Sequence, residues 1–321
     1  QSKSLRTQIQ DSLDKYYGIK RIDYSPISDN LDGTVKISRI VTNTTDTYLL
    51  DSTQGRVIRL TRSGQQYRMD YNFKCNPGQI GTVTVDKLID IVALPANTPN
   101  KATVMGIDKS GNLLYCIPGV NPLTRALPQP DMGWQDIGSM ALGDDGLLYV
   151  MDTKGNSVYI YLNDNYTYPD PPRLYFNNQI PADMAHMTAM AINRNELYLL
   201  NEDGHMVNCS FRAYAEAQTR CTDPILYRDD RPGKEGEHLR LEGTEFNQIY
   251  LAGVPDPSVF LLDRESSSLY QLSLRMTFYR QLKMQLYPER TPAQHASAFS
   301  ISPTRIIWIA YGNEVFYGLI P

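Results

Sequence analysis

The stretch LLYVMDTKGNSVYIYL, residues 147–162, has the pattern of two short strands joined by a tight turn. An apolar run ends at Asp152, a turn follows around Gly155 and Asn156, and the alternation of apolar residues then resumes. Glycine supplies the positive φ that such hairpin turns require, and asparagine tolerates it. Whether this hairpin occurs once or is repeated along the chain decides the fold.

The first strand of this hairpin recurs as an apolar run that closes on a polar residue or a tyrosine. The copies end at intervals of 44 to 62 residues, close to the period of propeller blades. They are TYLLD (47–51), VMGID (104–108), LYVMD (148–152), LYLLN (197–201), VFLLD (259–263) and IWIAY (307–311). A strand rich in small residues precedes each copy, and a Gly-, Asn- or Ser-rich turn and a further strand follow it. The repeat predicts an all-β protein, a six-bladed β-propeller with four-stranded antiparallel blades.

The sixth copy stops after its third strand, VFYGLIP, so its outer strand must come from elsewhere in the chain. The N-terminal segment IKRIDYSPI (19–27) is the expected donor, which would close the ring with both chain ends in one blade. The propeller is therefore expected to span residues 19–321.

Residues 1–18 lie outside the repeat and have the pattern of a short amphipathic α-helix. Leu5, Ile9, Leu13 and Tyr16 or Tyr17 fall on one helical face. Because one short helix is marginally stable alone, it should either pack on the propeller or end a longer helical stalk. Both alternatives remain open at this point.

Composition excludes some classes of partner. The chain has 31 basic and 35 acidic side chains, a net charge of −4, and no Lys/Arg-dense stretch, so a nucleic-acid partner is not expected. Its apolar runs are far shorter than the roughly 20 residues of a membrane-spanning helix. Since the chain begins at Gln1 rather than Met, a signal peptide or membrane anchor could precede it.

Four cysteines allow three disulfide pairings, and their spacing does not choose among them. Cys209 and Cys221 bracket a predicted hairpin whose two strands a disulfide could bridge. Cys75 and Cys116 are the remaining pair. Buried free thiols are the alternative.

The hairpin turns could also be metal loops, because DTKGN (152–156) begins with an acidic residue and its counterpart NEDGH (201–205) contains two. A calcium loop needs several oxygen ligands at alternate positions and usually a distal bidentate Glu, whereas these turns offer one or two acids. We therefore expect Asp152 to stabilise its own turn. The sequence has no HExxH, CxxC, GxSxG or P-loop motif, so it predicts no metal, no cofactor and no catalytic residue.

The expected binding site is the end of the central channel where the inner strands begin and their loops converge. Seven residues at or just before those starts are candidate ligand-binding residues: Arg39, Asp90, Trp134, Asp136, His186, Glu245 and His295. Three of them are acids that could hold a cation or a polar ligand, or could simply cap strand ends. Trp134 beside Asp136 suits a sugar or peptide, since an aromatic face next to a carboxylate favours such ligands.

Two segments are longer than a blade needs, the Tyr- and Pro-rich residues 162–176 and the charged residues 228–243. Long loops on a rigid scaffold often carry binding sites. The alternatives are edge packing for the tyrosines and a solvated connection between blades for the charged segment.

The order of DSTQGRVIRL, FKCNPGQ, LIDIVALP, GNLLYCIPG, PDMGWQDI, TRCTDP, DPSVFLLD and ISPTRIIWIAYGNEV resembles a family of uncharacterised bacterial propeller domains. The resemblance covers about residues 15–321. It implies an extracytoplasmic C-terminal domain of a membrane-anchored protein, in some members with a protein-phosphatase-like cytoplasmic domain, and a helical stalk before the propeller. More distantly, the blades are similar to NHL and TolB-type propellers and to gluconolactonase-type hydrolases, which hold a divalent metal on a Glu, Asn and Asp set. Asp90, Asp136 and Glu245 could imitate that set, although their local contexts do not match.

Three functions follow as hypotheses. The first is a non-enzymatic recognition or sensor domain that binds a protein, glycan or cell-wall ligand on its loop-bearing face. The second is a structural cell-surface or filament subunit that assembles with copies of itself. The third is a metal-dependent hydrolase or lyase of gluconolactonase-like type.

Overall fold

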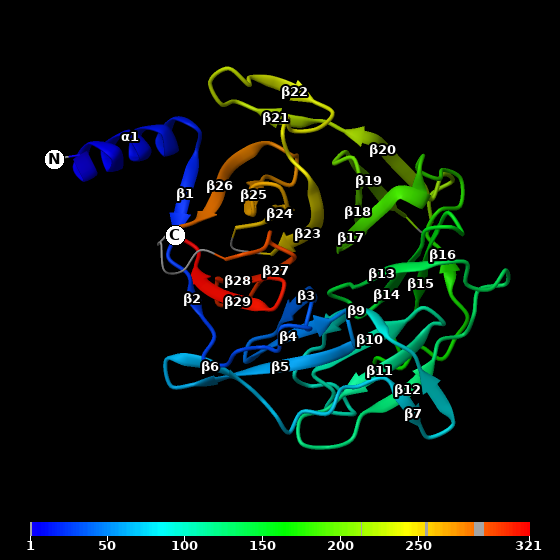
Figure 1. Cartoon of the computed structure of the whole chain (residues 1–321). Helices are drawn as coiled ribbons and strands as arrows, with labels where there is room; N and C mark the ends of the chain where they lie inside the picture. Colours follow the sequence, from blue (N-terminus) through cyan, green and yellow to red (C-terminus); the bar gives the residue numbers. More distant parts are fainter. Residues whose placement is uncertain (1, 213, 254–255, 286–291) are drawn as a thin grey trace.

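The strands form a ring of six blades around a central axis, as the repeat predicts (Figure 1). The computed structural model describes residues 2–212, 214–253, 256–285 and 292–321. Each blade is a four-stranded antiparallel sheet in which the first strand lies innermost, and one blade carries a fifth strand. The predicted fold class is thereby confirmed.

The first three blades follow one another along the chain. Blade 1 consists of β3 (Ile37–Thr42), β4 (Asp46–Asp51), β5 (Arg56–Ser63) and β6 (Gln66–Met69). Blade 2 consists of β9 (Leu88–Ala93), β10 (Val104–Asp108), β11 (Asn112–Cys116) and β12 (Leu123–Ala126), preceded by the small hairpin of β7 (Gly78–Ile80) and β8 (Val83–Val85). Blade 3 consists of β13 (Ile137–Leu142), β14 (Leu148–Asp152), β15 (Ser157–Tyr161) and β16 (Arg173–Leu174).

The other three blades follow after a short 3₁₀ helix, η1 (Met184–His186). Blade 4 consists of β17 (Met187–Asn193), β18 (Glu196–Asn201), β19 (Met206–Phe211) and β20 (Thr219–Ile225), and the hairpin of β21 (Tyr227–Asp229) and β22 (Gly236–His238) leads on to blade 5. Blade 5 contains β23 (Phe246–Ala252), β24 (Ser258–Asp263), β25 (Ser268–Leu272) and β26 (Phe278–Met284). Blade 6 contains β27 (Ala298–Ile301), β28 (Ile306–Tyr311) and β29 (Glu314–Leu319).

The N-terminal segment closes the ring, but it divides its pairing between two blades. Only β2 (Ser25–Pro26) pairs with β29 as the outer strand of blade 6. The residues before it form β1 (Ile19–Ile22), which pairs in parallel with β26 as the fifth strand of blade 5. The prediction that residues 19–27 act as one outer strand of blade 6 is therefore right only for its last part.

The hydrophobic core lies between blades rather than inside one central layer. Six clusters of buried side chains each join residues of two neighbouring blades, so that every interface around the ring has its own cluster. At the closing interface, Leu49 of blade 1 packs in one cluster with Trp308 of blade 6. The ring is thus held by apolar packing at each of its six interfaces.

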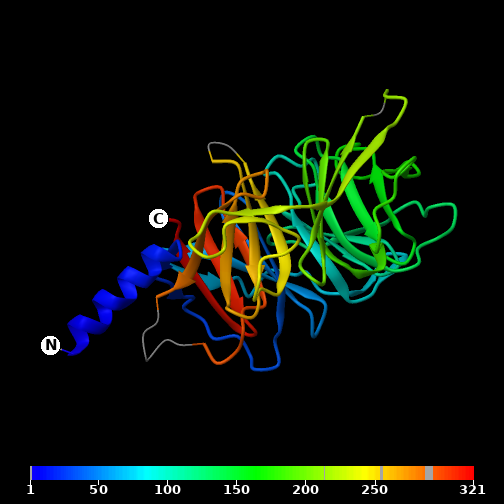
Figure 2. The same cartoon turned by 90° about the horizontal axis from the view of Figure 1, so that it is seen from above.

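The N-terminal helix α1 (Ser2–Tyr16) projects from the edge of the propeller (Figure 2). Leu5, Ile9 and Leu13 are 60%, 52% and 45% exposed, so its apolar stripe is not covered by the blades. Its attachment is instead polar, because both carboxylate oxygens of Asp14 accept hydrogen bonds from the Arg21 guanidinium on β1. Among the described residues, no helix has the length and apolar character that crossing a membrane requires.

All four cysteines are paired. Cys209 and Cys221, the pair suggested by the predicted hairpin, face each other on β19 and β20 and form a disulfide. Cys75 and Cys116 form the second disulfide, which ties the segment after blade 1 to β11 of blade 2. One bridge therefore lies within a blade, and the other joins two blades.

Candidate functional site

The aspartate that ends the second strand of blades 1, 2, 3 and 5 is a structural clamp. Asp152 is fully buried, and its carboxylate accepts hydrogen bonds from the backbone N–H groups of Gln135 (2.9 Å), Asp136 (2.8 Å) and Gly155 (2.9 Å). It therefore fixes both its own turn and the start of the inner strand of the same blade. Asp108 bonds in the same way to the N–H groups of Asp86 and Ser110.

Three predicted site residues, Asp136, His186 and Glu245, occupy equivalent positions on one face of the ring. Each lies directly before the inner strand of its blade. Its backbone carbonyl accepts the N–H of the residue that follows the second strand of the same blade. The side chains have different surroundings. Asp136 is paired with Lys109 and Lys154, and the Lys109 hydrogen bond is the main cause that lowers the pKa of its carboxyl. His186 lies 2.8 Å from Glu202, and Glu245 is exposed.

Arg39 and Asp90 lie inside the channel rather than at its mouth. They sit within β3 and β9, past a one-residue register shift near the start of each strand. The Arg39 guanidinium lies 3.2 Å from the Asp90 carboxylate, which also accepts the Met140 N–H of blade 3 at 2.9 Å. Burial raises the pKa of the Asp90 carboxyl, against the opposing effect of Arg39. This acid is thus committed to linking blades 1, 2 and 3.

Gln248 forms a second set of polar contacts between blades, on the other side of the channel. These contacts and those of Asp90 are called the polar belt below. Its amide nitrogen donates to the carbonyls of Ser38 in β3 (2.7 Å) and of Ser297, just before β27 (3.1 Å). Its amide oxygen accepts the Phe299 N–H at 3.2 Å. The side chain therefore connects blades 5, 6 and 1 where the ring closes. The channel beside it is a narrow space of about 200 Å³ lined by all six inner strands.

We expect Gln248→Leu to lower the free energy of unfolding by about 2 kcal/mol, because one buried and two partly buried backbone groups lose their partner. Urea denaturation of the variant would measure this. Gln79→Leu, which changes an exposed glutamine of β7, should cost well under about 1 kcal/mol. Equal losses in the two variants would contradict the role assigned to Gln248.

Trp134 packs into a blade interface, and its role as a ligand platform beside Asp136 stays a prediction. The indole packs edge-to-face on Tyr159 with ring centroids 5.4 Å apart, and it belongs to the cluster between blades 2 and 3. It also lies against Gly111, where a Cβ would collide with the indole. The tryptophan is directed into the blade interface because its neighbours there are apolar.

The two long segments are mainly structural. In residues 162–176, Tyr168 and Tyr175 are fully buried, as expected for edge packing. The charged residues 228–243 contribute most of the β21–β22 hairpin, in which Arg231 pairs with Asp229 and lies 4.0 Å from the centre of the Phe278 ring.

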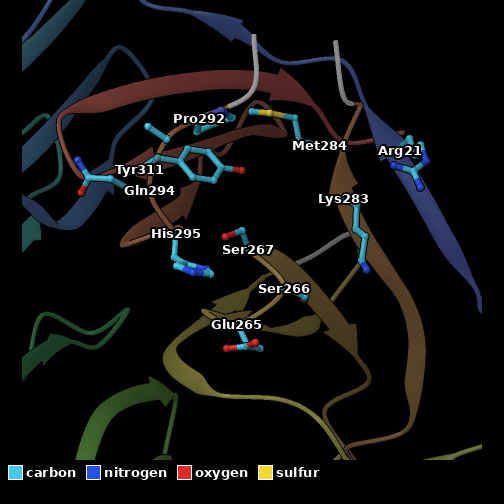
Figure 3. Close-up of a pocket in the computed structure, with 11 residues that line it drawn as sticks. Arg21, Glu265, Ser266, Ser267, Lys283, Met284, Pro292, Gln294, His295 and Tyr311 are labelled. Atoms are coloured by element: carbon cyan, nitrogen blue, oxygen red, sulfur yellow. The ribbon is translucent and has the colours of Figure 1, made fainter. Parts of the chain in front are cut away.

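A cavity of about 460 Å³ lies where β1, blade 5 and blade 6 meet, on the face where the inner strands begin (Figure 3). Its walls come from four parts of the chain: Arg21 on β1, Lys283 on β26, Glu265 to Ser267 in the β24–β25 turn, and the predicted site residue His295 with Tyr311 of blade 6. This volume lies in the range of small-molecule sites.

The cavity is rich in hydrogen-bonding groups held by the surrounding fold. The Ser267 hydroxyl oxygen accepts the Ala296 N–H at 2.9 Å, and the Ser266 hydroxyl bonds to the buried Asp263 carboxylate. In Figure 3 the Tyr311 hydroxyl points toward the centre of the cavity. Burial raises the pKa of Tyr311 well above its usual value, so its phenol remains a hydrogen-bond donor at neutral pH.

Sequence reasoning found one member of this cavity, His295, and missed Arg21 and Lys283. These two residues meet only because β1 pairs in parallel with β26, a contact between chain segments far apart in sequence. The sequence shows only that each of two expected outer strands contains a basic residue. That observation does not reveal that the two residues line the same cavity.

Comparisons with known proteins define the class through fold alone. No family model and no curated protein matches the chain. A gluconolactonase from Xanthomonas campestris is similar in structure with a TM-score of 0.61 and 10% identity, covering 94% of each chain. A streptogramin B lyase gives 0.59 and 9%, covering 92% of this chain and 97% of that one. A virginiamycin B lyase from Staphylococcus aureus gives 0.53 and 10%, covering 94% and 99%. At such identities the shared feature is the propeller.

Proposed function

We propose that this chain is a non-enzymatic recognition domain of a larger extracytoplasmic bacterial protein, and that its ligand binds in the cavity between blades 5 and 6. The observation that carries the proposal is the cavity itself, which joins charged and hydroxyl groups from β1, β26, the β24–β25 turn and blade 6. Such a convergence of polar groups on a concave site is typical of ligand recognition.

The disulfides support the extracytoplasmic setting. Both pairs of cysteines are oxidised, and disulfides persist in secreted and surface proteins but are rare in the cytosol. The sequence resemblance to membrane-anchored propeller domains points to the same setting.

A sensor role is supported by the position of Arg21. This side chain lines the cavity and also forms the hydrogen bonds to Asp14 that hold helix α1 against the propeller. A ligand that attracts the guanidinium would weaken that attachment, so occupancy and helix position would be energetically coupled.

The metal-dependent hydrolase hypothesis lacks a set of ligands in this structure. Asp90 pairs with Arg39, and Asp136 pairs with two lysines. Within the described ranges, no group of three or more His, Cys, Asp or Glu residues could hold a metal ion. The residues present therefore do not fit the divalent metal of gluconolactonase-type propellers, and the enzyme is not proposed.

The test is to block the cavity and measure binding of muropeptides from a peptidoglycan digest by saturation-transfer NMR. Ala293 is exposed and lines the cavity, so Ala293→Trp should fill it without disturbing the core and should weaken binding at least tenfold. Ala96→Trp, at an exposed alanine between β9 and β10, is the matched control and should bind like the unmodified protein. Undiminished binding by Ala293→Trp, or chemical conversion of the muropeptides, would reject the proposal.

A further inference from the structure

Two cations face one wall of the cavity from adjacent strands. In the parallel pair of β1 and β26, Arg21 lies directly opposite Lys283, and both side chains line the cavity. Like charges directly opposite each other in a sheet are destabilising. An arrangement that costs stability while bordering a cavity calls for a compensating negative charge.

Within the described part of the chain, an ion pair compensates only one of the two cations. Arg21 pairs with Asp14, with its Nε 2.5 Å from one carboxylate oxygen. Lys283 takes part in none of the ion pairs formed within the described part of the chain. Its pKa is lowered, first by burial and then by repulsion from Arg21.

The other charges near Lys283 do not remove this imbalance. Asp263 and Asp14 raise the pKa of Lys283 and Arg231 lowers it, and each of these effects is smaller than that of burial. Asp263 is bonded to the backbone of Glu245 and to Ser266, and Asp14 is used by Arg21. Of the described residues that line the cavity, Glu265 is the one acid, and the His295 imidazole also lines it.

We propose that the cavity binds the carboxylate of a small polar ligand, held between the Lys283 ammonium and the Arg21 guanidinium. The hydroxyls of Ser267 and Tyr311 are placed to bond the remaining polar groups of that ligand. A carboxylate here would relieve the repulsion between the two cations, and hydrogen bonds between ionised partners are the strong ones. This inference rests on the proposed function of the cavity as a ligand site and adds the chemical class of the ligand.

The shared carboxylate could belong to an acidic sugar or to the end of a short peptide. Two matched pairs of probes separate these sources: D-glucuronate with D-glucose, and N-acetyl-D-alanyl-D-alanine with its C-terminal amide. Each pair differs mainly in the negative charge. The acid should bind at least tenfold more tightly than its neutral counterpart in at least one pair, measured at constant ionic strength.

NMR of the lysine side chains reports the site directly. Binding of an acid should raise the pKa of the Lys283 ammonium, because a neighbouring anion favours its charged form. Lys283→Met should weaken binding of that acid at least tenfold, while Lys283→Arg retains the charge and should retain most of the affinity. Lys74→Met, at an exposed lysine before the blade 1–blade 2 disulfide, should change nothing.

The outcomes separate this inference from the proposed function. If acid and neutral probes bind equally and Ala293→Trp abolishes both, the cavity is a ligand site but the carboxylate assignment is wrong. If neither acid perturbs Lys283 more than Lys74, the carboxylate assignment is also wrong. If the probes bind undiminished to Ala293→Trp, both proposals fail.

Folding of the Lys283 variant is itself predictable. A lysine whose pKa is lowered in the folded state costs stability while it is charged, and this cost disappears as pH rises through the lowered pKa toward the ordinary lysine value. Lys283→Met should therefore be at least as stable as the unmodified protein at neutral pH, and its advantage should shrink at alkaline pH. Urea denaturation at several pH values would measure this, and a strongly destabilised variant at pH 7 would contradict the assigned imbalance.

Discussion

Asp152→Ala is expected to lower the free energy of unfolding by about 4 kcal/mol, since three backbone N–H groups lose hydrogen bonds to a charged acceptor. These are the N–H groups of Gln135, Asp136 and Gly155. Asp152 is fully buried, so water cannot readily replace the carboxylate. The loss should appear in urea denaturation followed by tryptophan fluorescence, because Trp134 lies just before the clamped segment.

Two further variants make this prediction specific. Asp152→Asn keeps one acceptor oxygen and should lose about half as much, since blade 4 carries Asn201 at the equivalent position. Asp145→Ala removes an exposed turn acid of the same blade, which accepts the Leu147 N–H at 3.1 Å, and should cost about 1 kcal/mol or less. A loss in Asp152→Ala no greater than in Asp145→Ala would show that the buried carboxylate is not a clamp.

The fold could be predicted because its signal is local and repeated. Each blade is mainly a series of hairpins between neighbours in sequence. The Gly-, Asn- or Ser-rich turn and the small-residue inner strand recur in every copy, and the closing Asp recurs in four of the six. The interpretation of Asp152 as a turn residue agrees with its contacts for the same reason. A short-range pattern predicts short-range structure well.

The candidate site was harder to predict because it depends on contacts between distant segments. Arg21 and Lys283 meet through a parallel strand pair that no hairpin pattern announces. Arg39 and Asp90 were expected at the channel mouth, but each is the third residue of its inner strand and so lies further along the channel. Trp134 was interpreted as a ligand platform because its neighbour in sequence is acidic, whereas its neighbours in space are aromatic.

On the face of the ring where the inner strands begin, the charged residues favour the cavity over the channel as the candidate ligand site. Asp136 and His186 already have partners of opposite or complementary charge, and Asp90 is committed to the polar belt inside the ring. Lys283 has no such partner among the described residues, although burial disfavours its charge. An uncompensated charge beside an open cavity is a stronger indication of a ligand than acids that satisfy one another.

The second large effect is expected from the disulfide between blades 1 and 2. Cys75 and Cys116 are 41 residues apart in sequence, and the chain-entropy model gives about 4 kcal/mol for closing a loop of that length. Cys209 and Cys221 are 12 residues apart, for which the same model gives about 3 kcal/mol. Both Cys75 and Cys116 are fully buried in the cluster between their blades, so replacing them with alanine also removes packing there.

The Cys75→Ala/Cys116→Ala protein should therefore lose more stability than the Cys209→Ala/Cys221→Ala protein, which serves as its matched control. Urea denaturation would give the ranking, and limited proteolysis should cleave the first variant fastest around blades 1 and 2, where the interface loses its covalent link. The outer strand of blade 6 is the short N-terminal strand β2, so a weakened blade 1 lies next to the point where the ring closes. If the Cys209→Ala/Cys221→Ala protein lost as much stability or more, the position of the Cys75–Cys116 disulfide between two blades would add nothing to its stabilising effect.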